Sequence, residues 1–70
     1  MKTIYDLQIY EKTTISRVNL SDADACMLKV LGFYKNNEIR CVYNKSFIIC
    51  EVLGIRYGIN ELIAKNIDVI

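Results

Sequence analysis

The sequence predicts a mainly β domain, a small five-stranded barrel with one short inserted α-helix. Two observations favour this class. A single amphipathic segment ends at Leu31-Gly32-Phe33, and beyond it four short runs with β-type patterning are separated by turns and one helical turn. Short strands that meander around one core are typical of SH3-like barrels. A two-layer α+β sheet is the alternative, but so short a helix covers too little of an open five-stranded sheet.

The length and composition fit one domain spanning residues 1–70. A chain of this size buries only about 60% of the surface that it exposes when unfolded, so its core must be dense in apolar side chains. The hydrophobic fraction of 53% meets that need. A net charge of +1 disfavours nucleic acid as a partner. No signal-peptide pattern and no apolar run near the roughly 20 residues of a membrane helix is present, so we expect a soluble cytoplasmic protein without membrane insertion.

The N-terminal third is predicted to contain a segment that covers the end of the barrel, followed by the first strand. Residues 4–10 have mixed apolar spacing, which fits a turn or a short strand that covers the end of the barrel. Thr14–Leu20 is rich in β-branched residues and is the first clear strand. Ile15 does not alternate in step with Val18 and Leu20, as residues on one face of a regular strand would. A bulge near Arg17 would bring the three side chains to the same face.

The helix is predicted to begin after Ser21 and to end at Leu31. Ser21 is a favourable N-cap, with Asp24 three positions on as in a capping box. Gly32 lies where a left-handed residue ends a helix, and Phe33 can then contact Leu28. The apolar spacing indicates a core-facing side made of Leu20, Ala23, Met27, Val30 and Leu31, with Cys26 beside it. The solvent-facing side is then Asp22, Ala25 and Lys29.

The second half is predicted to be strands and turns. A turn at residues 34–37 comes first, and we expect Asn37 to be left-handed there. The strands are Glu38–Tyr43, Phe47–Leu53, Ile55–Ile59 and Ile67–Val69, with a hairpin turn at Leu53-Gly54 and a helical turn capped by Asn60. The inward residues of the first two of these strands are Ile39, Cys41, Tyr43, Ile48, Cys50 and Val52. We expect the edges of the sheet to pair with each other as the barrel closes.

The residues that usually carry catalysis or bind metals are sparse. Histidine is absent, which removes the commonest metal ligand and the usual general base at neutral pH. The cysteines Cys26, Cys41 and Cys50 are odd in number and lack paired spacing, so we expect free thiols that fill core positions. The sequence therefore predicts no enzyme, no cofactor and no metal site, although weak metal binding by the thiols is left open.

The same elements resemble the ferrous iron transport protein A family, FeoA. The resemblance is carried by Met27–Phe33, by residues 38–42 and 48–52, by Gly54–Ile59 and by the ending 64–69. It implies an SH3-like barrel and an accessory role in bacterial ferrous iron uptake, through contact with the membrane transporter FeoB and its cytosolic GTPase domain. The sequence departs from many members at Asn36-Asn37, where they have Pro-Gly, and at Gly58, where they have Ala. Gly58 leaves room for a bulge or for a close approach by another backbone.

Six residues are candidates for partner contact: Phe33, Tyr34, Arg40, Tyr43, Arg56 and Tyr57. Three of them, Tyr34, Tyr43 and Tyr57, could form an aromatic groove for a proline-rich peptide, and packing in the barrel wall is the alternative. Arg40 and Arg56, expected on adjacent strands, could bind an acidic partner or be an ordinary solvated face. Phe33 is either a structural residue at the helix end or an exposed docking residue. Weak self-association through a barrel edge is also left open.

A second class of function stands beside the first. Similar barrels are appended to metal-dependent transcription regulators, so the chain could be an SH3-like module of such a regulator or a nucleic-acid-associated protein. Its net charge near zero and the lack of a helix-turn-helix pattern argue against this alternative.

Overall fold

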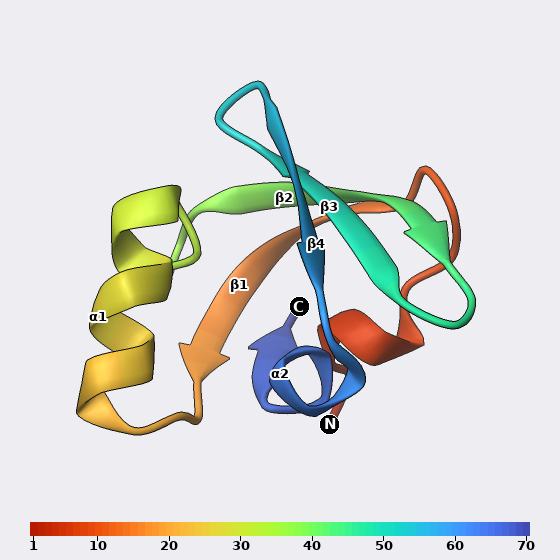
Figure 1. The fold of residues 1–70 in the computed structure, drawn as a ribbon. Helices are drawn as coiled ribbons and strands as arrows, with labels where there is room; N and C mark the ends of the chain where they lie inside the picture. The colour runs from red at the N-terminus through yellow and green to blue at the C-terminus, as the bar shows by residue number, and fades with distance from the viewer.

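The computed structural model describes residues 1–70 and contains five strands, one longer helix and two short helical segments (Figure 1). The elements are η1 (Ile4–Asp6), β1 (Lys12–Val18), α1 (Asp22–Leu31), β2 (Glu38–Asn44), β3 (Ile48–Val52), β4 (Ile55–Ile59), α2 (Glu61–Lys65) and β5 (Ile67–Val69). The predicted order of strands, inserted helix and late helical turn is confirmed. For the segment that covers the end of the barrel, the sequence allowed a turn or a short strand. The structure has the turn, a single turn of 3₁₀-helix at Ile4–Asp6.

The five strands form one antiparallel sheet in the order β4-β3-β2-β1-β5. Residues 12–14 of β1 pair with β2, and the rest of β1 pairs with β5. The switch occurs at a bulge between Ile15 and Arg17, which leaves Ser16 unpaired and confirms the bulge predicted near Arg17. A bulge bends its strand and increases the local twist, so β1 can serve both halves of the barrel.

The barrel does not close by pairing of its two edge strands, and the expectation that they would pair is wrong. The chain segment between β4 and β5 forms α2, whose first turn is capped by Asn60: its side-chain oxygen accepts a hydrogen bond from the Ile63 N–H at 2.8 Å. α2 packs against η1 and β5, as Figure 1 shows at the lower side of the molecule. The free edge of β5 is covered by the N-terminus, where Val69 N–H donates to the Lys2 carbonyl at 2.9 Å.

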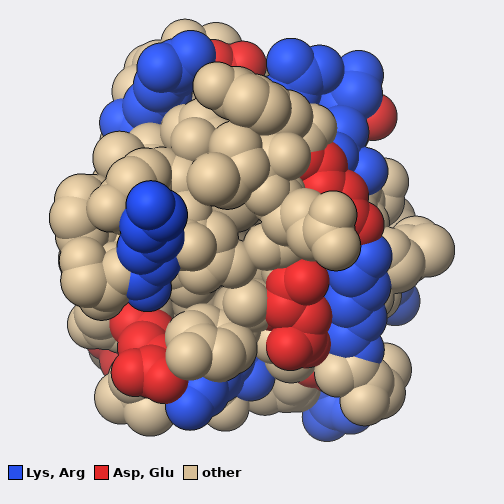
Figure 2. Space-filling view, turned by 90° about the vertical axis from the view of Figure 1, so that its right-hand side faces the viewer, with Lys and Arg blue, Asp and Glu red and all other residues tan.

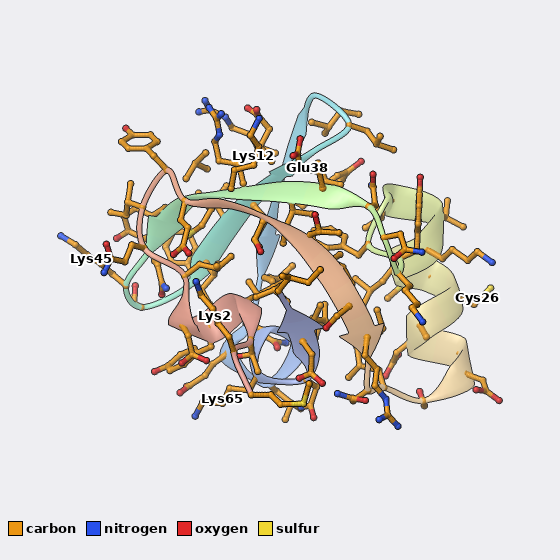
Figure 3. All side chains as sticks on the ribbon, turned by 180° about the vertical axis from the view of Figure 1, so that it is seen from behind. Lys2, Lys12, Cys26, Glu38, Lys45 and Lys65 are labelled. Atoms are coloured by element: carbon orange, nitrogen blue, oxygen red, sulfur yellow. The ribbon has the colours of Figure 1, made fainter.

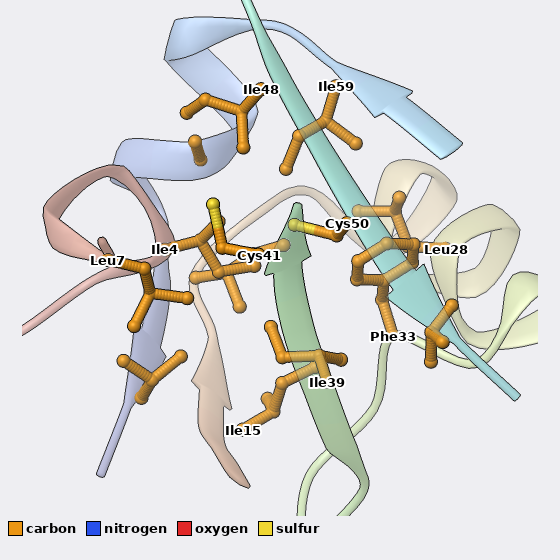
Figure 4. Packing of buried hydrophobic residues seen from close by; sticks show 14 residues of the cluster. Ile4, Leu7, Ile15, Leu28, Phe33, Ile39, Cys41, Ile48, Cys50 and Ile59 are labelled. Carbon is orange, nitrogen blue, oxygen red and sulfur yellow. The ribbon is translucent and has the colours of Figure 1, made fainter. Parts of the chain in front are cut away.

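A single apolar cluster fills the space between the sheet, α2 and the N-terminal turn (Figure 4). Its buried members are Ile4, Leu7, Ile15, Leu28, Phe33, Ile39, Cys41, Ile48, Cys50, Val52, Ile59, Ala64, Ile67 and Val69. The predicted inward residues of β3 are all among them. The cluster also draws one residue from α1, which therefore stands at the rim of the core.

The C-terminus of α1 has the predicted left-handed ending. Gly32 has φ +113°, Phe33 N–H donates to the Leu28 carbonyl at 2.9 Å, and Gly32 N–H donates to the Lys29 carbonyl at 3.1 Å. These are the two hydrogen bonds of a Schellman motif. The motif places Phe33, the residue after the glycine, in contact with Leu28. Phe33 and Leu28 are accordingly both buried.

The predicted core face of α1 is wrong in its middle part. Leu20 and Leu31 pack against the core as predicted, but Ala23, Met27 and Val30 are exposed. Met27 and Val30 are 58% and 81% exposed, whereas Leu28 is buried and Ala25 is half-buried. The predicted face has more apolar residues, but the Schellman motif fixes the helix through Phe33, and Leu28 must then point inward. The apolar Met27 and Val30 are left facing solvent.

Two further positions differ locally from the sequence-based predictions. The left-handed residue of the turn after α1 is Asn36, with φ +74°, rather than Asn37, whose side-chain NH₂ donates to the Gly32 carbonyl at 2.6 Å. In β2 a register shift between Cys41 and Tyr43 breaks the alternation, so Tyr43 is paired with the outward Ile49 and lies on the outer face. Its predicted inward orientation is therefore wrong.

Candidate protein-contact surface

Four charged side chains lie across neighbouring strands on the outer face of the sheet. The strand register pairs Lys12 with Arg40, Arg40 with Glu51, and Glu51 with Arg56. Directly paired residues of antiparallel strands point to the same face. We call this set, Lys12, Arg40, Glu51 and Arg56, the charged row. Both predicted arginines belong to it, but they are not on adjacent strands, because β3 and Glu51 lie between them.

The charged row is partly neutralised by its own carboxylates. Arg56 Nε donates to Glu51 Oε2 at 3.2 Å, and Lys12 Nζ lies 3.6 Å from Glu38 Oε1, a pair visible in Figure 3. Exposed pairs of this kind contribute little to stability and are readily exchanged for other partners. Arg40 is exposed and has no carboxylate within 4.0 Å, so it is the member most available to an acidic group.

The three tyrosines predicted to form an aromatic groove are not brought together. Tyr57 is paired with the buried Cys50, and its ring meets Phe33 edge to face with centroids 6.0 Å apart. Tyr43 packs on Phe47 at 4.9 Å, near the β2–β3 turn, and Tyr34 follows α1. A single groove for a proline-rich peptide is therefore absent, and packing in the barrel wall explains Tyr57.

Phe33 cannot contact a partner, because its side chain is fully buried, so it is a structural residue at the end of the helix. Tyr34, directly after it, is 37% exposed, and Arg56 is exposed while Tyr57 is half-buried. Of the two residues on β4, Arg56 is thus the one that a partner can reach. On the β2–β3 turn side, Figure 2 shows a broad uncharged area with charged side chains around it.

Gly58 shows neither of the features that the sequence suggested for it. β4 pairs with β3 without a register shift, and a Cβ built on Gly58 meets nothing within 4 Å. No bulge and no close backbone approach within the chain therefore accounts for this glycine. It leaves its cross-strand neighbour Ile49 partly uncovered on the outer face.

All three cysteines are free, but only two fill core positions. Cys41 and Cys50 are directly paired across β2 and β3 and are fully buried, with their sulfurs inside the barrel (Figure 4). Burial raises the pKa of both thiols, that of Cys50 to about 12. Cys26 is exposed on the outer side of α1 (Figure 3), contrary to its predicted place beside the core. No group of three or more Cys, Asp and Glu side chains is placed to hold a metal ion.

These thiols should differ sharply in reactivity. A thiol-specific disulfide reagent should modify Cys26 rapidly in the native protein and reach Cys41 and Cys50 only after unfolding, because the thiolate is the reacting form and burial suppresses it. The measurement is a reagent titration followed by mass spectrometry with and without denaturant. Rapid native labelling of all three would show that the β2–β3 core is open to solvent.

The pKa of Cys50 also predicts a loss of stability in alkali. The folded state keeps this thiol protonated up to about pH 12, whereas an unfolded cysteine ionises near pH 8.5. The raised folded-state pKa therefore favours the native state fully below pH 8.5 and progressively less above it. Unfolding free energies measured by urea titration should fall from pH 8 to pH 10.5. The decline should be smaller in Cys50→Ala than in the native sequence.

The fold defines the class of protein: a small SH3-like barrel with an inserted helix, built from five antiparallel strands. More particularly, the chain superimposes on the solution NMR structure of FeoA from Chlorobium tepidum with a TM-score of 0.85. The match covers 96% of this chain and 67% of that chain at 15% sequence identity. The predicted resemblance to FeoA is thus confirmed as a common fold. No family model and no curated protein matches the sequence. Neither α1 nor α2 has the length and apolar character that crossing a membrane requires.

Proposed function

We propose that this chain is a small cytoplasmic accessory protein of ferrous iron uptake, which acts by protein contact and catalyses no reaction of its own. The observation that carries the proposal is the FeoA fold, which extends over 96% of the chain. The partner that we propose is a FeoB-type membrane transporter, contacted on its cytosolic side at or near the GTPase domain. Because a shared fold can serve different functions, the proposal must be tested on the partner itself.

The charged row is the part of the surface that we propose for this contact. It lies on an outer face away from the core, and Arg40 presents a cation that no carboxylate of the chain neutralises. A 70-residue domain offers only a modest patch, and small patches are typical of weak, transient complexes. The dissociation constant should therefore be on the order of micromolar or weaker.

Binding should depend on Arg40 and Arg56 and respond to salt. Each of Arg40→Ala and Arg56→Ala should weaken binding by about 2- to 5-fold, as is usual for exposed charges at an interface rim, without lowering the melting temperature. The measurement is a titration of fluorescently labelled protein with the full-length transporter in lipid nanodiscs.

Lys45→Ala is the matched control, since Lys45 is also exposed, forms no ion pair and lies away from Lys12 of the charged row (Figure 3). If both arginine variants bind like the Lys45 variant, the contact lies elsewhere on the surface. No association at any salt concentration, with either the transporter or its cytosolic domain, would overturn the proposed partner.

The pure, reduced protein should contain well below one equivalent of iron or zinc. The reason is chemical: the chain has no histidine, Cys26 is remote from the other two thiols, and those two are held protonated by burial. Elemental analysis by mass spectrometry checks this prediction. A stoichiometric metal that survives a chelator would instead point to a cysteine site.

A further inference from the structure

An open groove of about 550 Å³ runs between α1 and the second half of β1. Figure 3 shows the molecule from behind, with β1 in front and α1 beside it. Leu28 is the one fully buried residue of α1, and Leu31, at the end of the helix, also packs against the core. Its lining residues are Ser16, Arg17, Val18, Ala25, Lys29, Phe33, Tyr34 and Lys35. We call it the α1–β1 groove.

The bulge in β1 brings two polar neighbours to the same groove. Consecutive residues of a regular strand point to opposite faces, but Ser16 is the extra residue of the bulge, and both Ser16 and Arg17 line the groove. The Ser16 hydroxyl is sealed from bulk solvent and has no hydrogen-bond partner in the chain. A buried polar group without a partner is rare in native proteins and marks a place where a ligand can supply one.

The groove holds three of the five cations that form no ion pair in the molecule. Of nine Lys and Arg residues, Lys2, Lys12, Arg56 and Lys65 form ion pairs, which leaves five without a carboxylate within 4.0 Å. Three of those five, Arg17, Lys29 and Lys35, line the groove. No Asp or Glu is among its lining residues. The groove is therefore a focus of positive charge in a protein whose net charge is only +1.

The accessible floor of the groove is apolar. Val18, Ala25 and Tyr34 line it beside the fully buried Phe33, and the hollow is open rather than enclosed. A small ligand is usually buried over most of its surface, and a compact inorganic anion would leave this floor uncovered. An extended segment with an apolar side chain flanked by carboxylates would cover the floor and pair with the cations on either side.

We propose that the α1–β1 groove binds an acidic peptide segment of a protein partner, in which Asp or Glu residues flank an aliphatic or aromatic side chain. A main-chain or side-chain group of that segment satisfies the Ser16 hydroxyl. The inference depends on charge and shape alone and holds whichever protein contributes the segment, so it stands apart from the proposed role in iron uptake.

The test is a titration of the isotope-labelled full chain, followed by two-dimensional NMR. The probe is a short acetylated peptide in which Glu residues flank one Leu and one Phe. Shifts should be confined to β1, α1 and residues 33–35, and the affinity should fall as salt rises. The same peptide with Gln in place of Glu should bind at least about tenfold more weakly.

Two charge-matched triple variants separate the groove from general electrostatics. Arg17→Gln/Lys29→Gln/Lys35→Gln should lose at least about tenfold in affinity. Lys2→Gln/Lys45→Gln/Lys65→Gln removes the same charge from positions away from α1 (Figure 3) and should bind nearly as well as the native sequence. Ser16→Ala should bind about 2- to 5-fold more weakly while remaining folded, because the hydroxyl meets its partner only in the complex.

Three results would overturn the inference. Equal losses in the two triple variants would show non-specific attraction, and equal binding of the Gln peptide would show that charge is not recognised. Groove shifts with inorganic phosphate but not with the acidic peptide would show a small-anion site instead.

Discussion

Replacing Phe33 by Ala is expected to destabilise the protein by about 3–5 kcal/mol, the range for a fully buried aromatic side chain. Phe33 is 0% exposed, links α1 to the barrel through the Schellman motif, and meets the ring of Tyr57 edge to face. At about 0.05–0.15 kcal/mol per residue, a domain of this size has a total stability of only about 3.5–10 kcal/mol. The variant should therefore lose a large share of the total stability and melt at a much lower temperature than the native sequence.

The measurement is urea unfolding at 25 °C, followed by circular dichroism. Phe47→Ala is the matched control, because Phe47 is the other phenylalanine of the chain and is 48% exposed. It should cost about 1 kcal/mol or less, most of it the lost contact with Tyr43. Similar losses in the two variants would mean that Phe33 does not anchor the core, and its place as a contact residue would have to be reconsidered.

Gly32→Val is expected to have the second largest effect, since two separate costs add at this position. The backbone has φ +113°, where a residue with a side chain is strained by about 1–3 kcal/mol. A Cβ would also lie 2.9 Å from Val52 Cγ2 and 3.0 Å from Leu53 Cδ1, and relieving such overpacking costs about 1–3 kcal/mol more.

Gly58→Val is the control for Gly32→Val, because Gly58 lies in β4 with open space around it and without a positive φ. It should leave the stability unchanged or raise it by about 0.5–1 kcal/mol, since glycine weakens a strand. Thermal melting of the two variants checks both expectations. A Gly32→Val melting temperature equal to that of the native sequence would show that the chain can leave α1 without a left-handed residue.

Local chemistry explains why most of the fold could be predicted. Ser21 at the helix start, Gly32 at its end, the Leu53-Gly54 turn and the Asn60 cap each act through hydrogen bonds or backbone angles within a few residues. Such signals can be found in a sequence because they need no knowledge of distant partners. The element boundaries that they set agree with the structure.

The errors arose where distant contacts decide the outcome. The count of apolar residues favoured the Met27–Val30 side of α1, but the anchor at Phe33 rotated the helix so that Leu28 points inward and Leu31 lies at the edge of the buried side. The bulge in β2 reversed the face of Tyr43 after two correctly predicted positions. Closure by α2 rather than by strand pairing is likewise a property of the assembled barrel.

The candidate surface was only partly predictable for the same reason. Arg40 and Arg56 could be found as outward residues of alternating strands, but their separation by Glu51 depends on strand order. The α1–β1 groove could not be found at all, since it requires the Ser16 bulge and the actual orientation of α1 together. Its three cations, Arg17, Lys29 and Lys35, are separated by 12 and 6 positions in the sequence and form no basic cluster there.

Ferrous iron uptake by the native host tests the central claim most directly. Cells that lack this gene should accumulate radiolabelled ferrous iron more slowly under reducing, iron-limited conditions than the parent cells. Uptake should return when the gene is supplied on a plasmid, and it should not return when the plasmid carries the core-disrupting Phe33→Ala variant. Equal uptake in the deletion strain and the parent strain would contradict the proposed role.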